Sequence, residues 1–299
     1  MKNVWLHRYA VLWSSCTLFL VVAGGLVTSH DAGLSVPDWP LSYGRLMPPM
    51  EGNIFYEHGH RMVATTVGLL TIVMAVWLAR VEKRRWVRNL GWIALAAVVA
   101  QGVLGGMTVI FLLPKPVSIG HACLAQLFFS TTVATALFTS ESWRRGAQVM
   151  DDAGAPPLHW LALAAPAAIL AQLALGAAAR HQALGILPHV CGALVATGTV
   201  LWVTVRVLMQ HAGDALRRPA LALLGITFLQ VFLGIAAYMS RLATADAPQP
   251  MPVMVGFTVA HVAVGALTLA ASVILAIQVF RNVRRPVREM HPAGVAVTS

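Results

Sequence analysis

Charged residues are scarce in this sequence of 299 residues. Only 11% are Asp, Glu, Lys or Arg, while 58% are hydrophobic and the mean hydropathy is +0.73. Ordinary soluble proteins carry roughly 25% charged residues. The composition therefore excludes an ordinary soluble domain and indicates a chain that crosses a membrane several times.

Cysteine is almost absent as well. The three cysteines, Cys16, Cys123 and Cys191, each lie within an apolar run, and neither a CxxC nor a CxxCH motif occurs. A thiolate metal site and covalent haem attachment are therefore not supported. We also expect no cleavable signal peptide, because the first apolar run is too long and lacks a small-residue cleavage site.

Eight apolar segments are present instead, each close to the length of about 20 residues that a transmembrane helix needs. They run roughly over 9–28, 57–79, 90–112, 118–139, 158–179, 188–209, 219–239 and 256–280. The sequence therefore predicts an all-α integral membrane protein with eight transmembrane helices. An even number of spans places both termini on the same side.

The basic residues are unevenly distributed between the two sides. Of the 21 Lys and Arg residues, 16 fall on the side of the termini and five on the other. The side with more Lys and Arg is normally cytoplasmic. We therefore expect a bacterial-type inner membrane protein with both termini in the cytoplasm, and we assign the net charge of +10 to topology rather than to nucleic-acid binding.

A repeated Gln-x-x-Leu-Gly pattern divides the chain into two halves. It occurs in the third, fifth and seventh segments, as Gln101–Gly105, Gln172–Gly176 and Gln230–Gly234, whereas the first segment has only Gly24-Gly25. Small residues there would let helices approach closely. Since each half has four spans, we predict two tandem four-helix bundles related by a pseudo-two-fold axis along the membrane normal. The predicted domains are 1–145, with a long outer loop at 29–55, and 158–299, joined by a solvated cytoplasmic hinge at 146–157.

Four of the eleven histidines occupy equivalent positions. His60, His121, His189 and His261 each lie one or two turns inside the outer end of an even-numbered segment. Haem iron takes axial imidazoles from opposite faces, and bundle cores commonly hold cofactors between facing helices. Zinc would need more clustered ligands, and copper would favour nearby Cys or Met. We therefore predict two haem sites towards the outer side, held by His60 with His121 and by His189 with His261.

Four basic residues lie near the same outer ends: Arg61, Lys115, Arg180 and Arg241. They could meet the propionates of a haem, or they could be ordinary interfacial anchors.

The two predicted sites differ in their polar neighbours. Glu57 lies three residues before His60, on the same helical face, with His58 and Arg61 beside it, whereas residues 186–191 contain no carboxylate. Ionisable residues at such depth are usually functional. We therefore expect the site of His60 and His121 to be reactive, and the site of His189 and His261 to be a plain electron carrier.

At this point the sequence resembles the haem A synthase family. The matching features are Glu57-x-x-His60-Arg61, the stretch Gly-Leu-Ser-x-Pro-Asp-Trp-Pro-Leu over 33–41, and the placed histidines. The resemblance implies oxidation of the C8 methyl group of haem O to a formyl group, with water as the probable oxygen source. The product would be haem A for cytochrome oxidase assembly.

The resemblance also implies a role for each candidate residue. His60 and His121 would hold the iron of the substrate haem O, His189 and His261 that of a haem B cofactor, and Glu57 would be catalytic. His58 and Arg61 are candidates for supporting Glu57. Implied partners are haem O, a haem O synthase that supplies it, an electron acceptor and membrane lipid, and a homo-oligomer is compatible with the sequence. Whether Asp31, Asp38 and Arg45 of the outer loop reach the site stays open.

One departure from the family concerns a cysteine pair in the first outer loop of many relatives. The matching positions here are Val36 and Ser42. We therefore expect no disulfide or thiol relay there, and expect packing of Trp39, Tyr43 and the loop prolines to hold the loop.

Two other functions are compatible with the same residues. A di-haem b-type membrane cytochrome would use all four histidines for electron transfer alone. A transporter built from parallel repeats would use the buried Glu and His as a proton relay and would need no haem.

Overall fold

Eight long helices make up most of the molecule in the computed structural model, which describes residues 4–152, 154–210 and 213–284. The long helices are α1 (Val4–Ser29), α2 (Gly52–Val81), α3 (Arg85–Ile110), α4 (Lys115–Thr139), α6 (Leu158–Arg180), α7 (Ile186–Met209), α8 (Asp214–Ala243) and α9 (Pro252–Asn282). All eight are long and apolar enough to cross a membrane. The prediction of an all-α integral membrane protein with eight spans is confirmed.

Several helices extend beyond the apolar runs that the sequence indicated. Helix α2 begins at Gly52 rather than at residue 57, so Glu57 lies in its second turn and not at its start. Hydropathy detects the stretch inside hydrocarbon, whereas backbone hydrogen bonds let the helix continue through the polar interface.

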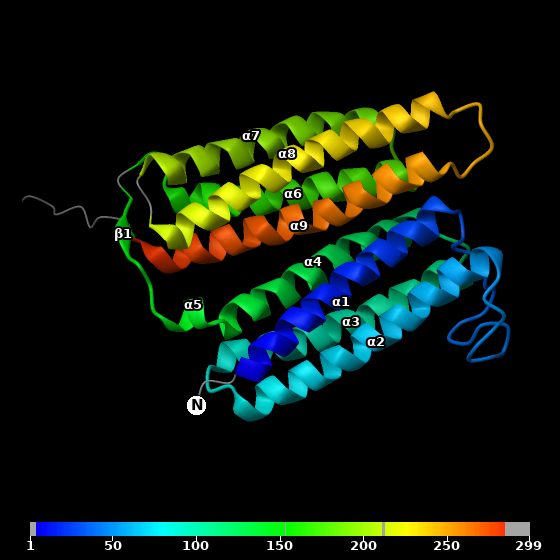
Figure 1. Ribbon diagram of the computed structural model, residues 1–299, viewed down its shortest axis with the longest axis horizontal. Coiled ribbons are helices and arrows are strands. Elements are labelled where there is room, and N and C mark those ends of the chain that lie inside the picture. Colours follow the sequence, from blue (N-terminus) through cyan, green and yellow to red (C-terminus); the bar gives the residue numbers. More distant parts are fainter. Residues whose placement is uncertain (1–3, 153, 211–212, 285–299) are drawn as a thin grey trace, which may run out of the picture.

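The helices of each half pack in a ring (Figure 1). Helix α1 contacts α2 and α4, and α3 contacts both α2 and α4; in the same way α6 and α8 each contact α7 and α9. Helices α1 and α4 pack against α9, and α4 also packs against α6, which joins the halves. A pseudo-two-fold axis relating the halves, and their status as separate domains, stay predictions.

Three apolar clusters correspond to this packing. In the first half the core is built around Trp13, whose indole N–H donates to Thr71 Oγ1 at 2.9 Å, and around Phe128 and Met74. In the second half it includes Leu158 and Leu223. A third cluster, Val21, Phe129, Ala266 and Ala270, fills the space between the halves.

Two ends of the molecule can be distinguished. The end where α1, α3, α6 and α8 finish and α2, α4, α7 and α9 begin is called here the outer-loop end, and it lies at the right in Figure 1. Helix α1 begins and α9 finishes at the opposite end. The terminal residues Lys2, Arg285 and Arg288, which entered the charge count, lie outside the described residues.

Most of the described linker residues are exposed, but one part of the linker is held by the helices. Asp152 is only 4% exposed, and its carboxylate accepts from the backbone N–H of Leu158 at 2.5 Å and from Gln210 Nε2 at 2.6 Å. It also forms an ion pair with Arg206 at 3.2 Å. Because a buried carboxylate needs such partners, Asp152 anchors the linker to α6 and α7.

Two short strands and a short helix complete the linker region. Helix α5 covers Glu141–Arg144, and strand β1 (Met150–Asp151) pairs in parallel with β2 (Val283–Arg284) directly after α9. The linker is thus fixed to the last helix as well.

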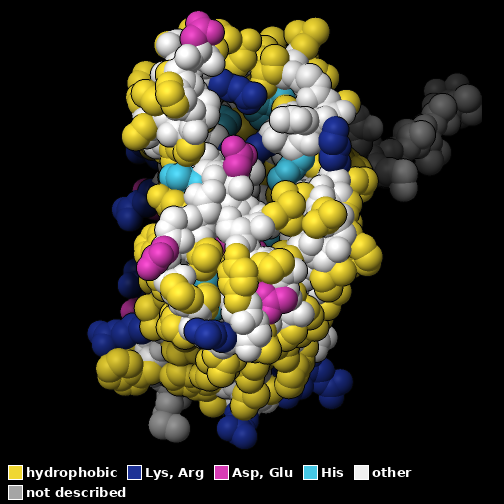
Figure 2. Space-filling view, turned by 90° about the vertical axis from the view of Figure 1, so that its right-hand side faces the viewer, with side chains coloured by type: hydrophobic (Ala, Val, Ile, Leu, Met, Phe, Trp, Pro, Cys, Tyr) yellow, Lys and Arg dark blue, Asp and Glu magenta, His cyan; other side chains and the backbone are white. Residues whose placement is uncertain are grey.

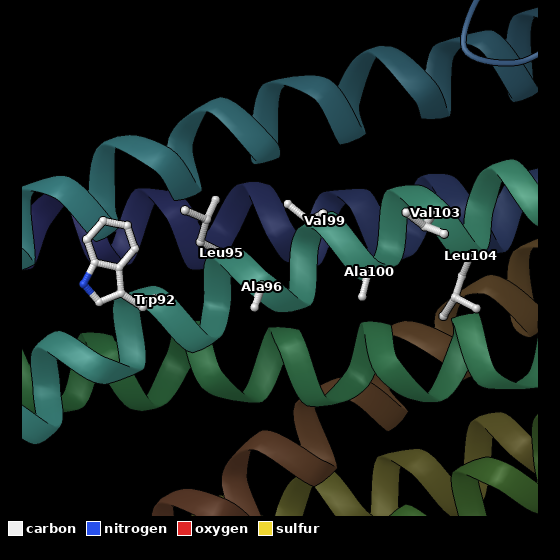
Figure 3. A pocket seen from close by; sticks show the side chains of 7 residues that line it. All are labelled: Trp92, Leu95, Ala96, Val99, Ala100, Val103 and Leu104. Carbon is white, nitrogen blue, oxygen red and sulfur yellow. The ribbon is translucent and has the colours of Figure 1, made fainter.

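Helix α3 presents an apolar groove of about 750 Å³ at the molecular surface (Figure 3). Its lining residues are Trp92, Leu95, Ala96, Val99, Ala100, Val103 and Leu104. Trp92, Val99 and Val103 are each about half exposed. In a membrane protein such a surface faces lipid chains, so the groove fits a lipid-covered side of α3 rather than a reaction site.

Candidate haem-binding sites and catalytic carboxylate

Glu57 is buried beneath the loop that joins α1 to α2. The residue is 4% exposed, and each carboxylate oxygen has a partner: Oε2 accepts from the backbone N–H of Val36 at 2.8 Å, and Oε1 accepts from Arg61 at 2.5 Å. Arg61 lies one helical turn after Glu57, so the two side chains share a face of α2. Two opposed hydrogen bonds fix the orientation of this carboxylate.

Arg61 holds the outer loop in place. Its guanidinium donates to the backbone carbonyl oxygens of Asp38 at 2.8 Å and Leu41 at 2.9 Å, and its second terminal nitrogen lies 3.4 Å from the carbonyl oxygen of Val36. Arg61 therefore joins the loop to the carboxylate of Glu57. A guanidinium suits this task because its donors are arranged in a fixed fork.

His58 points into the same loop. It is 6% exposed, and its Nδ1 lies 2.8 Å from Ser42 Oγ. The positions matching the relatives' cysteines, Val36 and Ser42, thus contact Glu57 and His58 respectively. Sequence reasoning missed both contacts, since they depend on the path of the loop.

The loop itself is closed by Asp38 and by aromatic packing. Asp38 accepts from the backbone N–H groups of Tyr43 at 2.6 Å and Gly44 at 2.8 Å. The bond from Gly44, followed by that from Tyr43 and the charge of Arg61, holds the pKa of Asp38 below its ordinary value. Trp39 packs on Gly106 of α3, where a Cβ would lie 2.8 Å from the indole ring. The expected packing of Trp39 is present, whereas Tyr43 is half exposed and its hydroxyl donates to the backbone oxygen of Ser35 at 2.6 Å instead.

The open question about the three polar loop residues has a partial answer. The side chain of Asp38 is engaged with the loop backbone, and Arg45 pairs through its backbone with Ser42. Asp31 is exposed at the end of α1, with a φ of 52°. These contacts lie within the loop or at its ends, so Arg61 and Val36 are the residues through which the loop reaches Glu57.

The four predicted histidines all lie near the outer-loop end, and each imidazole packs against a glycine of a neighbouring helix. A Cβ added to the glycine would lie 3.1 Å from the His60 ring at Gly24, 3.5 Å from the His121 ring at Gly105, and 2.8 Å from the ring at both Gly176 (His189) and Gly234 (His261). These glycines make room for imidazoles rather than only for close helix approach. The sequence pattern showed the glycines but not what they accommodate.

His189 and His261 face each other across the second half. Their ring centroids are 6.1 Å apart, with the ring planes at 88°. With metal–nitrogen bonds of about 2 Å, two imidazoles on opposite sides of one metal ion have centroids about 6 Å apart. The spacing therefore fits a shared axial ligand pair.

His60 and His121 form the corresponding pair in the first half and lie close enough to interact electrostatically. Within residues 4–152, 154–210 and 213–284, no group of three or more His, Cys, Asp or Glu side chains could hold a metal ion. Two imidazoles per half, in apolar helices, suit haem iron better than a bare metal ion.

The outer basic residues are largely engaged with protein groups. Arg180 donates to Gly25 O at 3.1 Å and to Ser29 Oγ at 2.7 Å, and Lys115 donates to Gln182 O at 2.6 Å. These bonds connect the two halves at the outer-loop end. Arg241 is exposed. Arg61, Lys115 and Arg180 therefore each hold segments of the protein together at this end of the molecule.

Histidine side chains are visible from the outer-loop end, several of them recessed below the surrounding side chains (Figure 2). The fold and the site together define a polytopic membrane protein with one histidine pair near the same end of each half, and with a buried carboxylate three residues before one of these histidines.

Comparison with known proteins assigns the chain more closely. A model of the COX15-CtaA family, described as cytochrome oxidase assembly protein, matches residues 7–189. The chain belongs to this family. The matched range contains Glu57, His60, His121 and His189 and ends before His261.

Curated relatives carry the name heme A synthase. The chain is 33% identical to the one from Shouchella clausii over 133 residues, 43% of this chain and 44% of the relative. It is 30% identical to that of Geobacillus thermodenitrificans over 156 residues, 50% and 49% of the two chains, and 31% identical to that of Symbiobacterium thermophilum over 141 residues, 46% of each. The chain thus spans about half the length of the curated relatives it matches.

Proposed function

We propose that this protein is a haem A synthase that oxidises the C8 methyl group of haem O to a formyl group. The observation that carries the proposal is the inequality of the two halves. Both have an imidazole pair, but three residues before His60 stands the buried, oriented Glu57, whereas Ile186 stands three residues before His189. The family and the names of the relatives support this assignment.

In this proposal the two halves divide the work. His60 and His121 hold the substrate haem O in the first half, and His189 and His261 hold a haem B in the second. Haem B supplies one-electron redox chemistry. The four electrons that leave the methyl group pass to an external acceptor, and both sites lie towards the outer side with the termini in the cytoplasm.

Glu57 acts where charge develops. Converting a methyl group and one water to a formyl group releases four protons and four electrons, and each two-electron oxidation leaves a carbon that water attacks. A fixed carboxylate beside that carbon stabilises the positive charge and accepts the proton of the attacking water. Two rounds give a geminal diol, which loses water to the aldehyde.

Arg61 and the outer loop support Glu57. Since Arg61 bonds one carboxylate oxygen and the Val36 N–H bonds the other, the loop keeps the carboxylate oriented and covers it from bulk water. Precise orientation of a reacting group can supply a large part of a rate enhancement.

The test is the haem content of cells that make haem O and express the protein. Wild type is expected to yield haem A on chromatography, and Glu57→Gln, which keeps the size but not the charge, to lower that yield by at least about 100-fold. The matched control is Glu51→Gln at an exposed carboxylate before α2, which should leave the yield unchanged.

Two outcomes contradict the proposal: wild type that makes no haem A, and Glu57→Gln that makes as much as wild type. A di-haem b-type cytochrome, which the facing rings of His189 and His261 also suit, predicts two retained low-spin haems and no response to Glu57→Gln. A transporter predicts purified protein without Soret absorbance.

A further inference from the structure

Four helices each present a glycine to one of the four imidazoles, and the residue four positions before that glycine is not the same in all four helices. In three cases a glutamine lies four residues before the glycine that faces the ring: Gln101 before Gly105, Gln172 before Gly176 and Gln230 before Gly234. The fourth case is α1, where Leu20 lies four residues before Gly24.

Each glutamine is bonded to the histidine that its helix faces. Gln101 Nε2 donates to the backbone oxygen of His121 at 3.1 Å. Gln172 Nε2 donates to the backbone oxygen of His189 at 2.8 Å and lies 2.9 Å from its Nδ1.

The third glutamine completes the pattern through its backbone. His261 Nδ1 lies 3.1 Å from the backbone oxygen of Gln230, and the side-chain Nε2 of Gln230 lies 3.4 Å from Nε2 of the same ring. A backbone carbonyl at Nδ1 is the arrangement that leaves Nε2 free for a metal.

His60 has no such partner among the described residues. Its Nδ1 is buried without a hydrogen-bond partner, and Leu20 packs against the apolar core of the first half instead. A leucine side chain offers no donor to the backbone of the facing helix.

We propose that the residue at this position sets how firmly the facing imidazole is held, and that Leu20 makes His60 the axial ligand that detaches when haem enters and leaves the first half. The inference rests on the proposed function, in which this half holds a substrate that must be exchanged. Outer partners of metal-bound histidines change metal affinity by roughly 10- to 100-fold when removed.

The two halves then differ as their tasks require. An electron-carrying haem has to stay bound, and in that half the backbone oxygen of Gln230 lies at Nδ1 of His261 while the side chain of Gln172 donates to the backbone oxygen of His189. A substrate haem has to leave after oxidation, and in that half neither His121 nor His60 has a partner for its buried Nδ1 within the described chain. His121 keeps the bond from Gln101 to its backbone, so His60 is the weaker of the pair.

The experiment measures haem release from the purified full-length protein. Protein loaded with haem B as the probe is mixed with excess apomyoglobin, and the transfer is followed by absorbance. Wild type is expected to release haem in a fast phase from the first half and a slow phase from the second. Leu20→Gln should slow the fast phase by about tenfold, and Gln172→Leu should accelerate the slow phase by a similar factor.

A matched control keeps position 20 apolar. Leu20→Met preserves size and packing but adds no hydrogen-bonding group, so it should release haem as wild type does. Carbon monoxide binding to the reduced protein gives a further readout, because the gas replaces a detaching imidazole. Leu20→Gln should slow that binding, whereas a change that affects only packing would not.

The outcomes separate this inference from the proposed function. Two release phases with rates unchanged in Leu20→Gln and Gln172→Leu, in protein that still makes haem A, overturn the inference alone. Protein that takes up no haem, or makes no haem A from haem O, overturns the proposed function itself.

Discussion

The two halves place an imidazole pair at the same end of four helices but surround it differently. In the first half a long connection over 30–51 covers Glu57, whereas the equivalent connection in the second half is the short stretch 181–185. The first half has the buried carboxylate of Glu57, and it has Leu20 at the position where the other three glycine-bearing helices have a glutamine. In the second half, both Gln172 and Gln230 bond the histidine that their helix faces. If the proposed function holds, the difference teaches that one scaffold becomes reactive through a loop, a carboxylate and a loosened ligand.

The largest expected effect comes from the loop, which only the first half has. Arg61→Lys replaces a five-donor fork by one ammonium, which cannot bond Glu57 and the carbonyl oxygens of Asp38 and Leu41 together. Misplacing a reacting group can lower a rate on the order of 100-fold. We expect haem A formation to fall by that order while the haem of the second half is retained, as measured by chromatography and absorbance.

The exposed Arg241 supplies the control, because Arg241→Lys should leave haem A formation unchanged. Unchanged formation in Arg61→Lys would show that the loop does not orient Glu57, and the contrast between the halves would then rest on the carboxylate alone.

The glycines give the next largest effect and should affect the halves unequally. Gly234→Ala and Gly176→Ala place a methyl carbon 2.8 Å from an imidazole ring, closer than carbon atoms normally approach, whereas at Gly105 the distance is an ordinary 3.5 Å. Overpacking of this kind costs about 1–3 kcal/mol. We expect the first two variants to lose, on purification, most of the haem that His189 and His261 are proposed to hold.

Gly105→Ala is the matched control in the first half and should retain wild-type haem content. Equal retention in all three variants would mean that the rings have room to move, and that the tight fit does not fix them.

The smallest expected effect comes from Asp152 in the linker. Burial works against ionisation of its carboxyl group. Hydrogen bonds from Leu158, Gln210 and Gly154, together with the charge of Arg206, nevertheless hold the pKa of Asp152 below its ordinary value. A lowered pKa in the folded state contributes stability above the unfolded value of about 3.9, and this contribution is lost as the pH falls through the folded value. Asp152→Asn should therefore destabilise the second half by about 1–3 kcal/mol at pH 7.

Thermal unfolding followed by the Soret band measures this effect. The difference from wild type should shrink as the pH is lowered below about 4. Asp151→Asn, at the exposed neighbour, is the control and should match wild type at every pH. A deficit in Asp152→Asn that does not change with pH would mean that the charge of Asp152 is not what anchors the linker.

Much of the architecture could be predicted because hydrocarbon imposes simple rules. The eight spans follow from apolar length, and the four histidines and Glu57 stand out because ionisable groups are costly in such segments. Contacts that depend on the path of a loop or linker have no such signal. Val36 was merely an apolar residue and Asp152 merely a charged one until folding placed them against Glu57 and Arg206.

The glutamines mark the limit of repeat analysis. Three Gln-x-x-Leu-Gly matches showed a repeated element, and small residues suggested close helices. Only the contacts show that the glycine receives a ring and that the glutamine bonds the same histidine. The presence of Leu20 in place of a fourth glutamine can be interpreted only once the contacts of the other three glutamines are known.

The way in which the outer loop is fastened has a consequence for how the protein matures. Val36 and Ser42 hold the loop through hydrogen bonds to Glu57 and His58, and Cys16, Cys123 and Cys191 are all free. Closing the loop over the carboxylate therefore requires no oxidative folding machinery. The same fastening would form in an oxidising or a reducing compartment, so folding of the first half is independent of the thiol chemistry of its surroundings.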